Sequence, residues 1–98
     1  MIAHLDRSVA VRAKVTFKGR VQGVFFRANC TDNARNLGLS GYVRNLSNGD
    51  VEAVFEGERE TVEEAIRWNK KGQPHARVTE ANVEWGEATG EFNGFFRR

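Results

Sequence analysis

One segment of this chain combines the residue types that hold a phosphate group. It runs from Gly19 to Arg27 and reads GRVQGVFFR, with glycine at two points and arginine at its end. An alternating pattern typical of a β-strand precedes it, and apolar spacing typical of a helix follows. Backbone N–H groups at a helix N-terminus have no partner within the helix and lie at the positive end of its dipole.

This placement predicts an anion-binding loop. Amides that turn toward the start of a helix form a nest for an anion, and the fork of the Arg27 guanidinium can bind two phosphate oxygens. The residues alone leave a second interpretation open, a tight turn in which Arg27 makes a surface ion pair. Cys30 falls on the apolar stripe of the helix that follows and is expected to be a core thiol.

The apolar pattern elsewhere predicts the elements that position this loop. Strands are expected at residues 11–18, 41–46, 51–55, 78–85 and 92–96, and helices at 27–37 and at about 61–71. The order β-α-β-β-α-β with a short terminal strand is that of the ferredoxin-like fold, an α+β two-layer sandwich. We therefore expect two helices on one face of a mainly antiparallel sheet.

Local signals set the boundaries of these elements. Asn48-Gly49 predicts a hairpin turn, and Gly38 and Gly72 each stand where a helix ends. Thr61 to Glu64 fit a capping box, although the helix could already include residues 58–60. Val78 is out of phase with the apolar residues that follow it, which indicates a β-bulge.

Length and composition exclude several classes of protein. The 98 residues suffice for one small domain, for which we expect a loose tail at 1–10 and a folded unit at 11–98. A single cysteine excludes an intrachain disulfide and a cysteine metal cluster. No apolar run is long enough to span a membrane, and the formal net charge is only +2. We expect a soluble cytoplasmic protein without nucleic-acid or membrane partners.

Two stretches of the sequence resemble the signatures of the acylphosphatase family. GRVQGVFFR fits the form G-x-V-Q-G-V-x-[FY]-R, and GYVRNLSNG, which begins at Gly41, fits G-[FWY]-V-x-N-x-x-x-G. The similarity runs from about Val11 to the end of the chain. Ser47-Asn48 departs from the turn of many members, which affects the turn more than the chemistry. The resemblance implies hydrolysis of the carboxyl–phosphate bond of acyl phosphates on a ferredoxin-like fold.

The resemblance also implies which residues carry the reaction. Arg27 would bind the phosphate and Asn45 would orient the attacking water, without a metal, a cofactor or a phosphoenzyme. Backbone amides of the loop would complete the phosphate site, at Gln22, Gly23, Val24, Phe25, Phe26 and Arg27. The expected partner is a small acyl phosphate, with inorganic phosphate as product and competitive inhibitor, and the expected state is a monomer.

Alternative functions remain at this stage. The fold and the motif also suit a domain that binds phosphate or carbamoyl phosphate without robust turnover. An RNA-binding module has the same element order, but Glu52 and Glu56 would face its ligand and no aromatic platform is apparent. Arg20 and Arg44 could raise the potential beside the loop. Arg97-Arg98 could help an anion approach, although a solvated end is the default expectation.

Overall fold

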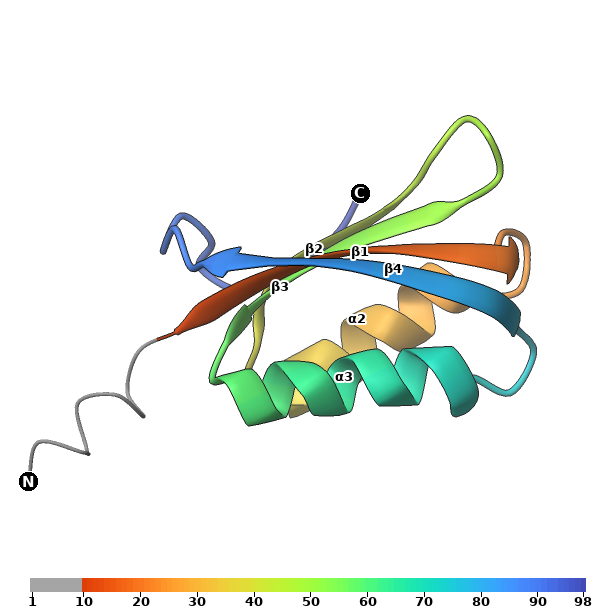
Figure 1. The fold of residues 1–98 in the computed structure, drawn as a ribbon. Helices are drawn as coiled ribbons and strands as arrows, with labels where there is room; N and C mark the ends of the chain where they lie inside the picture. Colours follow the sequence, from red (N-terminus) through yellow and green to blue (C-terminus); the bar gives the residue numbers. More distant parts are fainter. Residues whose placement is uncertain (1–9) are drawn as a thin grey trace, which may run out of the picture.

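Two helices cover one face of a five-stranded sheet in the computed structural model, which describes residues 10–98 (Figure 1). The expected loose tail thus lies, except for Ala10, outside the described residues. The elements are β1 (Val11–Arg20), α2 (Phe26–Asn36), β2 (Ser40–Asn45), β3 (Val51–Gly57), α3 (Arg59–Lys71), β4 (Arg77–Glu87) and β5 (Phe95–Arg97).

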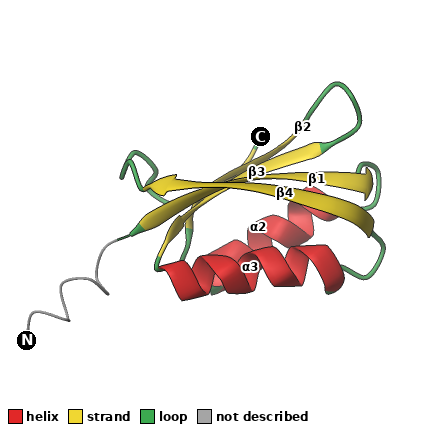
Figure 2. Ribbon diagram, viewed as in Figure 1, coloured by secondary structure: helices red, strands yellow, loops and turns green. Residues whose placement is uncertain are grey.

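The sheet has the order β4-β1-β3-β2-β5 and is antiparallel except where β5 runs parallel to β2. Both helices lie on the same side of it, and the other face carries no helix (Figure 2). This arrangement confirms the ferredoxin-like fold and its short terminal strand. No helix among residues 10–98 is both long and apolar enough to cross a membrane.

The core lies between the sheet and the helices, where the alternation of β1 predicts it. Ala13, Val15 and Phe17 are fully buried on the face of β1 that the helices cover. Helix α2 adds Phe26, whose ring centroid lies 5.1 Å from that of Phe17. Cys30 is also fully buried, and burial raises the pKa of its thiol, so it is a core thiol as expected.

The local signals set most boundaries correctly. Gly38 adopts a positive φ of 73° directly after α2 and donates its N–H to the carbonyl of Arg35. The bulge is confirmed in β4, where Lys18 pairs with Glu80 but Gly19 pairs with Val78. The intervening residue of β4 therefore has no partner in the ladder.

One expected element start is wrong, and for α3 the earlier of the starts that the sequence left open is the one observed. Helix α3 begins at Arg59 with Glu58 as its N-cap, so Thr61 already lies within the helix and forms no capping box. Only Glu58 separates the helix from the end of β3, and the chain turns into it as soon as it leaves the sheet. The last strand begins at Phe95 instead of residue 92, because Phe92 remains in the loop, where its ring packs 5.8 Å from that of Tyr42.

Ion pairs cover the face of the sheet that has no helix. Glu56 is only 3% exposed and accepts hydrogen bonds from Arg12, from both the N–H and the hydroxyl of Thr89, and from the N–H of Gly90. Burial alone would raise the pKa of Glu56, but these hydrogen bonds outweigh it and lower the pKa. The carboxylate thereby ties the loop after β4 to the middle of the sheet.

Gly41 in β2 is required by the close approach of its neighbour. Its φ is +135°, and a Cβ added there would overlap the carbonyl oxygen of Val54. We expect Gly41→Ala to lower the free energy of unfolding by about 2–4 kcal/mol, measured by urea denaturation. Gly86→Ala in β4 is the control, because a Cβ there meets nothing within 4 Å. Equal stability of the two variants would contradict this explanation.

Candidate active site

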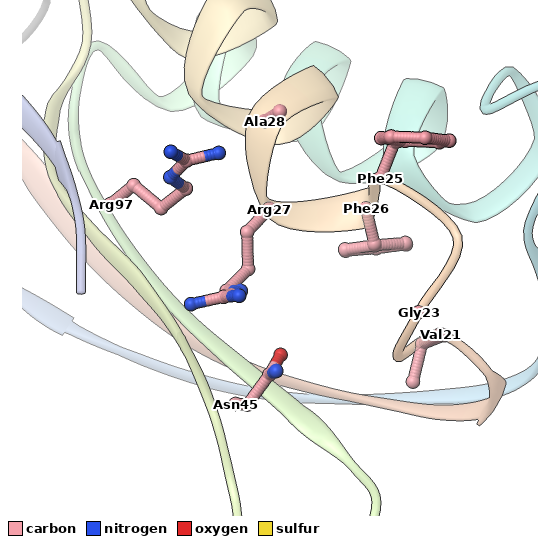
Figure 3. A pocket seen from close by; sticks show the side chains of 8 residues that line it. All are labelled: Val21, Gly23, Phe25, Phe26, Arg27, Ala28, Asn45 and Arg97. Atoms are coloured by element: carbon pink, nitrogen blue, oxygen red, sulfur yellow. The ribbon is translucent and has the colours of Figure 1, made fainter.

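The loop between β1 and α2, the start of α2, the end of β2 and the end of β5 surround one cavity (Figure 3). Its volume is about 260 Å³, and its walls carry two arginines and one asparagine among mostly apolar groups. The lining residues are Val21, Gly23, Phe25, Phe26, Arg27, Ala28, Asn45 and Arg97. Segments that are far apart in the sequence therefore meet at this point.

Arg27 is the second residue of α2 and extends its guanidinium into the cavity, toward Asn45 (Figure 3). One nitrogen, Nη1, donates a hydrogen bond of 2.8 Å to the backbone carbonyl oxygen of Arg98. Among residues 10–98, no Asp or Glu side chain forms an ion pair with Arg27. The surface ion pair with an acidic side chain that the sequence left open is therefore not made, and the guanidinium donors other than this one are available to an anion.

The loop before α2 is a tight turn in which two residues have a left-handed backbone conformation. Gly23 and Phe25 both have positive φ, 75° and 64° respectively. Phe25 is the N-cap of α2 and has no side chain that could cap the helix, so the first amides of α2 have no side-chain partner there. Its ring is 73% exposed and lies on the side of the loop away from Arg27, near His75 (Figure 3).

The side chain of Gln22 turns away from the cavity and joins the loop to the β2–β3 hairpin. Its Nε2 donates hydrogen bonds of 2.8 Å to the carbonyl oxygens of Leu46 and Asp50. Val24 also lies outside the lining, and its side chain is buried in the core. The structure thus brings the other expected site residues to the cavity, and the role expected of the loop amides stays a prediction.

Asn45 is the last residue of β2 and reaches the cavity from the side opposite the helix (Figure 3). Its backbone pairs with Val51 in the ladder, which fixes its position in the hairpin. Its side chain is exposed and makes no hydrogen bond to another residue of 10–98. The amide can therefore accept from one group and donate to another without breaking an internal bond.

Arg97 lines the cavity, although the sequence interpretation treated it as part of a solvated end. Residues two apart in a strand share a face, so Arg97 lies on the same side of β5 as the buried Phe95. That alternation could have shown from the sequence which residues share a face with Arg97, but not that this face borders the cavity. Arg98 turns elsewhere, with its guanidinium carbon 4.2 Å from the centre of the Tyr42 ring.

Other groups considered from the sequence lie outside the cavity. Arg44 pairs with Glu52 at 2.7 Å on the far face of the sheet, and Arg20 is not among the lining residues. Glu52, which was expected to face an RNA ligand, is only 5% exposed. Within the described part of the chain, no group of three His, Cys, Asp or Glu residues could hold a metal ion.

The sequence matches the family model for acylphosphatase over residues 13–96. The chain belongs to the acylphosphatase family. It is 51% identical to the acylphosphatase of Pelotomaculum thermopropionicum over 84 residues, which cover 86% of this chain and 91% of the relative. It is 52% identical to that of Aeropyrum pernix over 90 residues, or 91% and 89% of the two chains.

A solved structure supports the same assignment at the level of the fold. The crystal structure of acylphosphatase from Bacillus subtilis superposes with a TM-score of 0.85 at 28% identity, covering 90% of this chain and 98% of the other. The agreement includes the arrangement of two helices on one face of the sheet. The elements that surround the cavity therefore belong to the shared family fold.

Removing the Gln22 amide tests whether it holds the loop to the hairpin. We expect Gln22→Met to lower the free energy of unfolding by about 1–2 kcal/mol in urea denaturation, because two hydrogen bonds between the loop and the hairpin are lost, although each carbonyl oxygen keeps a backbone donor. Asn45→Ala is the matched control and should change stability by less than about 0.5 kcal/mol, since its side chain makes no internal bond. A Gln22 variant as stable as wild type would refute this role.

The left-handed conformation of Phe25 predicts an unusual preference for glycine. Phe25→Gly and Phe25→Ala both remove the same exposed ring, but only glycine adopts a φ of 64° without strain. We expect the glycine variant to be more stable than the alanine variant by about 1 kcal/mol in urea denaturation. The reverse order would show that the loop does not impose this conformation.

Proposed function

We propose that this chain hydrolyses acyl phosphates by direct attack of water on phosphorus, with the phosphate held by Arg27 and the loop amides and the water oriented by Asn45. The family supports the activity. The observation that supports the two roles is that Arg27 and Asn45 extend from different elements into one cavity (Figure 3). Monomeric state, cytoplasmic location and competitive inhibition by inorganic phosphate are part of the proposal.

Arg27 supplies the charge that phosphoryl transfer needs. A guanidinium remains protonated at any pH at which the protein is folded, and its planar fork matches two oxygens of a phosphate. The loop amides from Gln22 to Phe26 add neutral donors at the start of a helix, where the dipole favours an anion. Together they stabilise the negative charge that spreads over the phosphate oxygens in the transition state.

Asn45 positions the nucleophile. Its amide oxygen accepts a hydrogen bond from water and its amide nitrogen donates to a phosphate oxygen, so one side chain fixes the water relative to phosphorus. The water oxygen forms its bond to phosphorus as the bond from phosphorus to the carboxylate oxygen breaks. The bonding electrons leave with the carboxylate, and the proton of the water passes to the product phosphate or to solvent.

This reaction does not require a general acid. The leaving group is a carboxylate with a pKa near 4.3, about that of a glutamate, so it departs without a proton. The two side chains proposed for the reaction are a guanidinium and a neutral amide, neither of which acts as an acid or a base in it, and no step needs a metal ion. The rate should therefore vary little between about pH 5 and 8.

One variant of each residue can test whether Arg27 binds the phosphate and Asn45 orients the water. With benzoyl phosphate as substrate and a chelator present, we expect Asn45→Ala to lower kcat by about 10²–10³ while inorganic phosphate still competes. Arg27→Ala should abolish both turnover and competition by phosphate. Arg67→Ala and Asn82→Ala, both at exposed positions outside the cavity, are the matched controls and should behave as wild type.

Three outcomes would contradict the proposal. A folded wild-type protein that hydrolyses no acyl phosphate would leave only a phosphate-binding relative. Loss of activity with the chelator, restored by added metal, would overturn the metal-free mechanism. If both variants lost phosphate binding equally, the division of roles between Arg27 and Asn45 would be wrong.

A further inference from the structure

A second cavity adjoins the phosphate site along α2 and β5. Its volume is about 440 Å³, and it shares Ala28 and Arg97 with the first cavity. The remaining lining residues are Thr31, Asp32, Arg35 and Phe96. Because Arg97 lies at the boundary, a molecule held at Arg27 can extend into the second cavity without leaving the surface.

We propose that this second cavity binds the acyl part of the substrate and selects acyl groups that carry a second negative charge, which Arg97 and Arg35 hold. The proposal rests on the function proposed above, since it assumes that the phosphate binds at Arg27. It adds a substrate class that the phosphate site alone does not specify.

The in-line geometry of phosphoryl transfer indicates on which side of the phosphate the acyl group lies. In phosphoryl transfer the attacking and leaving oxygens lie roughly in line on opposite sides of phosphorus. If Asn45 positions the water, the acyl group departs on the side away from Asn45. Figure 3 shows Arg97 and Asn45 on different sides of the Arg27 guanidinium, and on this basis we place the acyl group on the side of Arg97.

No acidic side chain among residues 10–98 forms an ion pair with the two arginines of the second cavity. Among residues 10–98, neither Arg35 nor Arg97 forms an ion pair, and Asp32 is the single carboxylate of the second cavity. Arg35 is held in place because its Nε donates a hydrogen bond of 3.0 Å to the carbonyl oxygen of Phe95. Its terminal nitrogens are left for a ligand, and Arg97 adds a second cation beside it.

The other residues that line the second cavity do not compete with Arg35 and Arg97 for the negative charge of the acyl group. The hydroxyl of Thr31 donates its one proton to the carbonyl oxygen of Arg27 at 2.8 Å, so it offers no donor to a ligand. Phe96 is 44% exposed and can cover the methylene groups of an acyl chain. An acyl group with a short apolar chain and a terminal carboxylate matches both features.

The test compares succinyl phosphate, which has a terminal carboxylate, with acetyl phosphate, which has none. Wild type should show a higher kcat/KM for succinyl phosphate, and added salt should reduce this preference. We expect Arg97→Met, which keeps the length of the side chain, to lower kcat/KM for succinyl phosphate about three- to tenfold. The value for acetyl phosphate should fall by a smaller factor, because its acyl group has no carboxylate for Arg97 to bind.

Two further variants distinguish loss of the charge at Arg97 from other effects of the substitution. Arg67→Met removes the same charge from an exposed position on α3 and should leave the ratio of the two substrates unchanged. Arg97→Lys keeps the charge and should retain most of the preference, which a purely structural role of Arg97 would not predict.

Each adverse result has a separate meaning. Equal losses for both substrates in Arg97→Met, or no preference in wild type, would overturn the second subsite while leaving the proposed hydrolysis intact. Failure of wild type to hydrolyse either substrate would instead overturn the proposed function itself.

Discussion

Two hydrogen bonds from the Gln22 side chain hold the halves of the site together. Arg27 and the loop amides belong to the connection between β1 and α2, whereas Asn45 belongs to β2. The strand order β1-β3-β2 brings these segments together, and the amide nitrogen of Gln22 joins them further by donating to the carbonyl oxygens of Leu46 and Asp50, at 2.8 Å each. A reaction that depends on holding a water near phosphorus loses rate quickly when that distance varies. Gln22 therefore contributes to function through geometry.

The three-residue strand β5 positions two groups of the site, the Arg97 side chain and the backbone oxygen of Arg98. It is fixed to β2 by hydrogen bonds of 2.9 Å at both ends, and the Phe95 ring stacks on that of Phe55 at 5.5 Å. From this position it supplies Arg97 to both cavities and leads to the Arg98 carbonyl that orients Arg27. A guanidinium already held by one bond loses less conformational entropy when a phosphate binds to its remaining donors.

Short-range signals predicted most of this fold, and the misses occur where distant segments meet. Gly38 and the Asn48-Gly49 turn act within a few residues of themselves, so their effects could be read from the sequence. The resemblance supplied Arg27 and Asn45 together, although the expected capping box at Thr61 was wrong. Arg97 was missed because its place depends on the loop after β4 carrying the chain to the opposite edge of the sheet. No local pattern determines that crossing.

The distribution of charge connects the fold to the chemistry. On the face without helices, Glu52 and Glu56 pair with Arg12, Lys14 and Arg44, so that surface offers little free charge to a polyanion such as RNA. Around the two cavities, by contrast, the arginines have no Asp or Glu side chain as an ion-pair partner among residues 10–98, and cationic side chains gather where the proposed phosphate would bind. Because a carboxylate leaves without a proton, the mechanism proposed above uses this positive potential and a positioned water but no acid. The same mechanism predicts that an alkyl phosphate, whose leaving group needs a proton, is not a substrate.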